Sequence, residues 1–295
     1  MNLIKPEFLK KGDTVGFLST SGAIEDKESI MRAKAFFENL GYKVILSDNI
    51  FDKNRYLAGS DDKKVQELHN FFLNPEIKAI VCARGGYGAI RLIDKLDYEL
   101  ISKNPQIFCG YSDITALSLM MYKKSGLITF SGPMAKGDFG TEIPDDYTIN
   151  SFFKAVTSEV LTFDVDYKGE SVSGILWGGN LATVVSLCGQ DFIPDEDFIF
   201  FAEDLNEPVY KIDKMLTQLF NIDKFRKNIK ALVVGDFLDV DNKLWLDELL
   251  NEISSKYNVP VASGLKATHL KEKDTFPVGA MAKLSDDKLS CFLNN

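Results

Sequence analysis

Apolar, strand-like runs alternate with amphipathic, helix-like runs along the first 135 residues of the chain. Apolar residues recur at helical spacing in residues 27–40 and 61–73, and the almost wholly apolar run KAIVCARGG follows at 78–86. A run without polar alternation is typical of a parallel strand buried on both faces. The alternation therefore predicts a doubly wound α/β sheet, in which helices join parallel strands.

Three small-residue segments follow expected strands: STSG at 19–22, ARGGYG at 83–88 and GYSD at 110–113. Ligands of such sheets bind beyond the carboxyl ends of the strands, so these segments should carry the chemistry. ARGGYG, with a helix expected over 88–95, is neither a P-loop nor a GxGxxG fingerprint. Its paired glycines suit an oxyanion donor loop or an anion-binding loop, and a plain helix-initiating turn is the alternative.

The pattern changes near residue 158. Residues 160–170 are extended and polar, and the strand-like runs after them are short and interrupted by two helical stretches. This mixture predicts an α+β domain. We expect an N-terminal parallel-sheet α/β domain over residues 1–158, a linker over 159–170 and a smaller β-rich α+β domain over 171–295.

Charge and hydropathy restrict the partners of the chain. A net charge of −9 argues against nucleic acid, which needs a basic face. No apolar run approaches the roughly 20 residues that span a bilayer. The N-terminal residues also lack the apolar core of a signal peptide. We therefore expect a cytoplasmic protein without a membrane partner.

The four cysteines form no CxxC pair, and the two histidines lack the spacing of zinc ligands. We expect no metal and no cofactor, and we expect Cys82 and Cys109, which end or follow apolar runs, to be buried, reduced thiols. Cys109 lies directly before the GYSD segment, which leaves a cysteine-based amidotransferase as an alternative. The apolar run around this residue predicts burial, which argues against that alternative.

The two histidines differ in their surroundings. His69 lies in VQELHNFF on an expected helix, where a surface structural role is favoured. His269 lies in the irregular stretch SGLKATHLKEKDTFPVG, and functional residues concentrate in such loops. His269 is therefore the candidate general base, with a structural role as the alternative.

The GYSD segment places Ser112 between a buried strand and a helix. On such a turn the hydroxyl points outward, above the free N–H groups and positive dipole of a helix N-terminus. These groups favour an attacking oxygen and a developing oxyanion. The alternative is that Ser112 or Asp113 only caps the helix. The segment is not the GxSxG pentapeptide, because Ile114 occupies its last position.

Several carboxylates follow the apolar run FIFFA. Glu203 and Asp204 end this run, and a carboxylate that leaves a buried strand can orient an imidazole. The alternative for this pair is a solvated strand end. Glu207 and Asp213 fit helix capping and surface pairing.

Eight segments occur in one order along nearly the whole chain: GDTVGFLSTSG, ARGGYG, FCGYSDITAL, FSGPM, LWGGNLATVVSLCGQDF, FFAEDLNEPVYKIDKMLTQL, ALVVGDF and a histidine followed by DTFPVGAMAKL. This order resembles the LD-carboxypeptidases, which include the microcin C immunity peptidases. The resemblance implies an α/β domain and a strand-built C-terminal domain with the site between them. Typical members have glycine before the histidine, where this chain has Thr268.

The resemblance also implies a Ser–His–Glu triad that needs no metal or cofactor. The GYSD serine of the family matches Ser112, the first acid of its ED pair matches Glu203, and its histidine matches His269. Oxyanion donors would be the backbone N–H groups of Asp113 and of a glycine in ARGGYG, for which Gly86 is our candidate.

For the family, the substrate is murein tetrapeptide, which loses its terminal D-alanine during cytoplasmic cell-wall recycling, and homodimers are common. The resemblance therefore implies a serine carboxypeptidase. Alternatives are an immunity-type hydrolase of aminoacyl-nucleotide amides and a non-catalytic ligand-binding α/β protein. A free substrate carboxylate needs a cationic or N–H partner. Arg84 is a candidate for this role, and equally for tethering its own loop.

Overall fold

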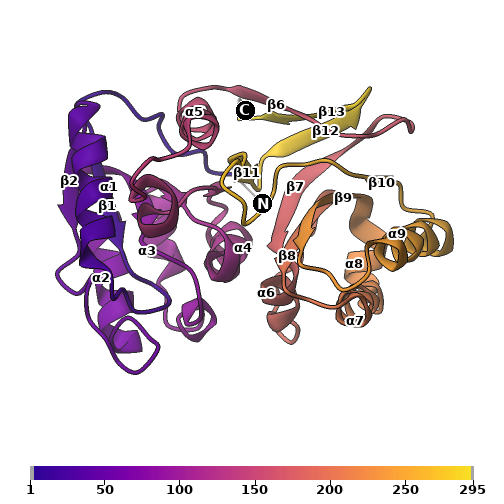
Figure 1. The fold of residues 1–295 in the computed structure, drawn as a ribbon, viewed down its shortest axis with the longest axis horizontal. Coiled ribbons are helices and arrows are strands. Elements are labelled where there is room, and N and C mark those ends of the chain that lie inside the picture. The colour runs from indigo at the N-terminus through magenta and orange to yellow at the C-terminus, as the bar shows by residue number, and fades with distance from the viewer. Residues whose placement is uncertain (1–2, 294–295) are drawn as a thin grey trace.

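The computed structural model describes residues 3–293, so the ends of the two predicted domains, residues 1–2 and 294–295, lie outside the described residues. Two β-sheets stand beside each other, and helix α4 lies between them (Figure 1). The predicted α/β class is confirmed. The extents of the predicted domains and linker stay predictions.

The first sheet has six strands in the order β11-β5-β4-β3-β1-β2. Its strands are β1 (Thr14–Leu18), β2 (Lys43–Leu46), β3 (Ile77–Cys82), β4 (Ile107–Cys109), β5 (Thr129–Ser131) and β11 (Phe276–Val278). Its helices are α1 (Lys27–Asn39), α2 (Asp61–Leu73), α3 (Tyr98–Lys103), α4 (Thr115–Ser125) and α5 (Asp146–Ala155), with the short helical turns η1 (Ala89–Arg91), η2 (Ser112–Ile114) and η3 (Ala135–Phe139).

Strands β1 to β5 are parallel, and the chain reverses its direction of travel across the sheet between β1 and β3. Such a switch point opens a crevice at the carboxyl ends of the two strands. All five residues of β1 and nearly all of β3 are buried, which confirms strands covered on both faces. The crevice lies where the STSG and ARGGYG segments leave these strands.

The second sheet has seven strands in the order β10-β9-β8-β7-β12-β13-β6. Its strands are β6 (Val160–Asp164), β7 (Val172–Asn180), β8 (Phe198–Leu205), β9 (Ile229–Leu238), β10 (Val261–Ala262), β12 (Met281–Ser285) and β13 (Lys288–Phe292). Its helices are α6 (Leu181–Ser186), α7 (Val209–Phe220), α8 (Asp223–Asn228) and α9 (Lys243–Tyr257). Strands β7 to β10 are parallel, whereas β6, β12 and β13 pair antiparallel and alternate buried with more exposed residues.

Strand β11 connects the two halves of the chain. It comes from the C-terminal half but pairs antiparallel with β5 at the edge of the first sheet. In Figure 1 it lies between the two sheets, next to α4. The loop between β10 and β11 therefore spans from one sheet to the other, and this loop contains His269.

The prediction of a helix over residues 88–95 is wrong. Only the three-residue turn η1 forms there. Gly88 has φ of 141°, a conformation that no helix uses, and the turn ends at Leu92. Short-range backbone hydrogen bonds, such as that from the N–H of Leu92 to the carbonyl oxygen of Ala89, and burial of Leu92 and Ile93 hold this segment. In the described part of the chain, no helix is long and apolar enough to cross a membrane.

Candidate functional site

The three segments that follow β1, β3 and β4 meet at the carboxyl edge of the first sheet, as predicted. The N–H of Gly22 donates to the carbonyl oxygen of Gly85 over 3.2 Å. A Cβ added at Gly85 would lie 3.2 Å from Cβ of Ser112 and 3.3 Å from its Oγ. The glycine loop therefore packs its bare backbone against the Ser112 side chain.

Ser112 has φ of 61°, in the left-handed region that residues with a side chain seldom adopt. Such strain clusters at functional sites. The capping alternative is wrong, because neither Ser112 nor Asp113 caps η2 or α4 with its side chain. Instead, Asp113 Oδ2 accepts a hydrogen bond from the N–H of Ala89 over 2.9 Å. This hydrogen bond ties the serine turn to the glycine loop. Burial raises the pKa of the Asp113 carboxyl.

The two residues expected to supply oxyanion donors each directly follow a residue of the contact between Gly85 and Ser112. Asp113 is the second residue of η2, so its N–H has no carbonyl within the turn to bind. This nitrogen lies 3.6 Å from the position of a Cβ at Gly85. Gly86, the next residue of the loop, is exposed and has φ of 111°, which a side chain would strain.

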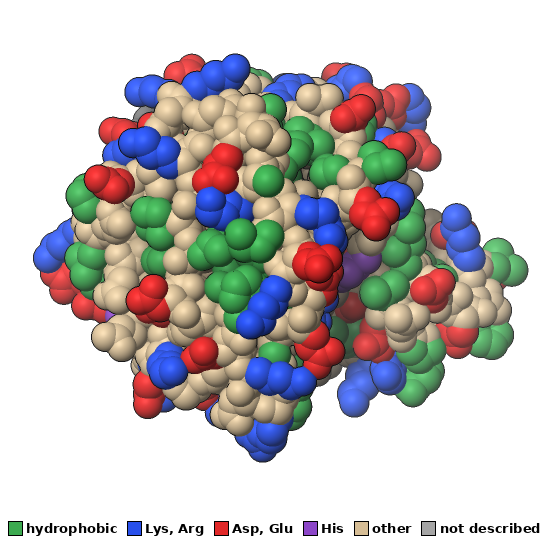
Figure 2. Space-filling view, turned by 60° about the vertical axis from the view of Figure 1, so that its left-hand side comes forward, with side chains coloured by type: hydrophobic (Ala, Val, Ile, Leu, Met, Phe, Trp, Pro, Cys, Tyr) green, Lys and Arg blue, Asp and Glu red, His purple; other side chains and the backbone are tan. Residues whose placement is uncertain are grey.

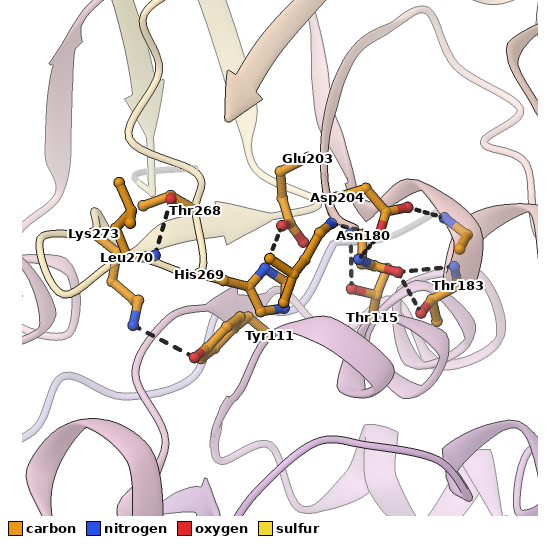
Figure 3. Close-up of polar contacts among 12 residues, drawn as sticks. Tyr111, Thr115, Asn180, Thr183, Glu203, Asp204, Thr268, His269, Leu270 and Lys273 are labelled. Carbon is orange, nitrogen blue, oxygen red and sulfur yellow. Dashed lines mark hydrogen bonds and ion pairs between the residues drawn. The ribbon is translucent and has the colours of Figure 1, made fainter. Parts of the chain in front are cut away.

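Glu203 and His269 form a buried contact. Oε2 of Glu203 lies 2.8 Å from Nδ1 of His269, and their side chains are 5% and 16% exposed (Figure 3). The distance fits an ion pair, although the angles do not meet those of a hydrogen bond. Burial lowers the pKa of His269, but the contact with and charge of Glu203 outweigh it, so this pKa is raised. Burial also raises the pKa of Glu203, against the effect of the histidine.

Tyr111 connects this pair to the serine turn. Its ring meets the His269 imidazole edge to face, with centroids 5.2 Å apart (Figure 3). Because Tyr111 directly precedes Ser112, the imidazole lies beside the serine turn. Within residues 3–293, no hydrogen bond joins Ser112 to His269. Catalytic hydrogen bonds are often long before substrate binds.

Lys273, in the same loop as His269, anchors that loop to the first half of the chain. Its ammonium pairs with the buried carboxylate of Asp138 in η3. It also lies 4.7 Å from the centroid of the Tyr111 ring. The hydroxyl of Thr268, which stands where the family typically has glycine, accepts from the N–H of Leu270 over 3.0 Å. These contacts fix the loop on both sides of the histidine.

Asp204 does not lie at a solvated strand end, and neither does Glu203, because each residue is only 4% exposed. Asp204 accepts from the Asn180 side chain over 2.9 Å and from the N–H of Ala182 over 2.8 Å (Figure 3). The N–H of Asn180 donates in turn to Oγ1 of Thr115 over 3.2 Å. This chain of contacts connects the β8 end that carries Glu203 to the helix that follows Ser112.

The other sequence candidates have structural contacts. Nε2 of His69 accepts from the N–H of Asp97 over 2.9 Å, which confirms a structural role. Glu207, which precedes α7, pairs with Lys211 of that helix over 3.2 Å, as expected. The Cys109 thiol is fully buried, and burial raises its pKa well above the ordinary range. A thiol that cannot ionise is a poor nucleophile, so the amidotransferase alternative loses its support.

The contacts of Tyr111, Asp138, Asn180 and Lys273 could not be predicted from the sequence. Tyr111 lies inside the GYSD segment and Lys273 lies close to His269, but the sequence does not reveal what either residue contacts.

Within residues 3–293, no group of three or more His, Cys, Asp or Glu side chains could hold a metal ion. Figure 2 shows a histidine side chain in a hollow of the surface, with side chains of both charges around it.

Comparisons with known proteins find relatives that match both halves of the chain. Residues 15–132 match the model of the LD-carboxypeptidase N-terminal domain, and residues 173–284 match that of the LD-carboxypeptidase C-terminal domain. The chain is 33% identical to a probable murein peptide carboxypeptidase of Bacillus subtilis, over 95% of this chain and 91% of that protein. It is 28% identical to the microcin C7 self-immunity protein MccF of Escherichia coli, over 95% and 92%.

A solved structure gives the same result in three dimensions. The crystal structure of muramoyltetrapeptide carboxypeptidase from Oxalobacter formigenes superposes on this chain with a TM-score of 0.87 and 29% identity. The match covers 95% of this chain and 98% of that one, so both halves of the fold are included.

Proposed function

Since this chain belongs to the LD-carboxypeptidase family of serine peptidases, we propose that it removes the terminal D-alanine of murein tetrapeptide. The scissile bond joins an L-centre to that D-residue. Ser112 is the nucleophile, His269 the general base and Glu203 the acid that orients the base. The observation that carries this proposal is the buried 2.8 Å contact between Glu203 and His269, packed through Tyr111 against the serine turn.

The geometry suggests how the steps follow. Because Nδ1 of His269 faces Glu203, Nε2 is free to take the proton of the Ser112 hydroxyl. The hydroxyl oxygen attacks the scissile carbonyl carbon. The backbone N–H groups of Asp113 and Gly86 hold the resulting oxyanion, each contributing about 2.7–4 kcal/mol. His269 returns the proton to the amine of departing D-alanine, and water then hydrolyses the acyl-enzyme by the same route.

Mass spectrometry of murein tetrapeptide incubated with the purified protein tests this function. We expect the parent protein to release D-alanine and the Ser112→Ala variant to release none above background. Equal release by both would exclude Ser112 as the nucleophile. No release by either would exclude murein tetrapeptide as the substrate.

A second candidate is hydrolysis of aminoacyl-nucleotide amides, which the similarity to the self-immunity protein MccF favours. The same triad would act on a different amide. Incubation of the parent and Ser112→Ala proteins with an aminoacyl sulfamoyl nucleoside tests this candidate. Cleavage of this compound, with the tetrapeptide left intact, would favour the second function over the first.

We also propose that the protein acts in the cytoplasm as a homodimer in cell-wall recycling. Its substrate would be a small peptide, with no nucleic acid or membrane partner. Cell fractionation tests the location, and sedimentation velocity tests the assembly. A monomer at working concentration, or recovery with the membrane fraction, would contradict these proposals.

A further inference from the structure

Arg84 lies at the switch point of the first sheet, beside the predicted oxyanion loop. It follows β3, and its Nη1 donates to the carbonyl oxygen of Ala23, beyond the end of β1, over 3.0 Å. Its Nε donates to the carbonyl oxygen of Gly85 over 3.2 Å. The guanidinium therefore bridges the two loops that border the crevice where α/β sheets bind ligands.

These two contacts use only part of the guanidinium, which has five N–H donors. Nη2 lies 3.3 Å from the position that a Cβ at Gly86 would occupy, and the side chain is half-buried. Within residues 3–293, no carboxylate lies at ion-pair distance from this group. Arg84 is thus a cation held in place by neutral carbonyls, with its outer N–H groups available.

The position suits one part of the substrate. In a carboxypeptidase substrate, only the nitrogen and Cα of the last residue separate the scissile carbonyl carbon from the terminal carboxylate carbon, so about three bonds join them. A cation for that carboxylate must therefore lie about one residue from the oxyanion donors. Arg84 meets this condition, since its Nη2 lies beside Gly86 and its neighbour Gly85 packs on Ser112.

On the basis of the proposed function, we propose that Arg84 binds the free C-terminal carboxylate of the peptide and so restricts the enzyme to terminal residues. The planar guanidinium can pair with a carboxylate through parallel N–H groups while its other donors keep the loop contacts. This contact discriminates a terminal acid from an amide. Tethering of the loop alone would give no such discrimination.

The test compares murein tetrapeptide with the same peptide ending in D-alaninamide. We expect the parent protein to have a kcat/KM about 10- to 100-fold higher for the acid, the range expected for hydrogen bonds to a charged group. Arg84→Gln should lose most of this preference, and Arg84→Lys should keep part of it. Arg91→Gln is the matched control, because Arg91 lies in η1 and is paired with Asp61 over 2.6 Å. It should keep the full preference.

Two kinetic results would overturn the inference. An Arg84→Gln variant that loses activity equally on acid and amide would show a structural tether only. A parent protein that cleaves both peptides equally would exclude carboxylate recognition altogether. If the parent cleaves neither peptide, the proposed function fails. Calorimetry of the acid and amide peptides binding to the Ser112→Ala and Ser112→Ala/Arg84→Gln proteins then decides the role of Arg84. Preference for the acid that disappears with Arg84 supports the role, and any other binding result overturns it.

Discussion

Oε2 of Glu203 lies 2.8 Å from Nδ1 of His269, although the two residues belong to different structural elements. Glu203 is fixed in β8, between two parallel neighbours, and His269 lies in the loop that leads from β10 to β11. The contact exists only because that loop crosses between the sheets. It sets the protonation of the proposed base, which makes it directly measurable.

The pKa values of the two histidines should separate in a proton NMR titration. Burial lowers the pKa of His69, whereas Glu203 outweighs burial at His269 and raises its pKa above the ordinary 6.5. Glu203→Gln removes the charge, so it should lower the upper pKa only. The upper signal is assigned by its disappearance in His269→Gln.

The same contact predicts the pH dependence of the reaction. A general base must be deprotonated, so kcat/KM should rise with pH through the raised pKa of His269. Glu203→Gln should lower kcat by about 10⁴-fold, by analogy with loss of the acid in other triads. An acid limb that lies below 6.5 in the parent would contradict the assigned base.

Gly85→Ala should reduce kcat by about 10- to 100-fold while the protein stays folded, because small displacements of reacting groups are costly. The added methyl would lie 3.3 Å from Oγ of Ser112, so the serine or the loop must move. Gly137→Ala is the control, since a Cβ there meets nothing within 4 Å. Full activity in Gly85→Ala would mean that the serine position is not critical.

Lys273→Met should lower the free energy of unfolding by about 3–5 kcal/mol, because it leaves a buried carboxylate unpaired. The partner Asp138 is only 6% exposed on its side chain. The double variant Lys273→Met/Asp138→Asn should be less destabilised than the sum of the single variants, since both charges are gone. Urea unfolding measures these values, and simple additivity would contradict a coupled pair.

Thiol alkylation should leave Cys109 unmodified in the folded protein and activity unchanged. This thiol is fully buried and its pKa is raised. Cys188 is half-buried and should react first, and all four cysteines should react in urea. Mass spectrometry of peptides locates the label, and loss of activity in proportion to labelling of Cys109 would revive a thiol mechanism.

Local patterns were sufficient to predict many of the elements. Helix α2 spans Asp61–Leu73, as its apolar spacing predicts, and β3 is buried on both faces, as its apolar run predicts. Such elements depend on side chains close together in the chain. The missing helix over 88–95 has a local cause as well, since Gly88 at the start of the segment adopts a φ of 141°, which is incompatible with a helix.

By itself, the sequence determined the α/β class, the three loops at the carboxyl edge and, through its ordered motifs, the family. Tertiary structure alone decided how these parts meet. It paired β11 with β5, brought His269 to Glu203, buried Lys273 against Asp138 and left Arg84 with free donors beside the crevice. Periodicity reports which face of an element is buried. Contacts between residues far apart in the chain depend on how whole sheets and loops pack, and no local pattern encodes that.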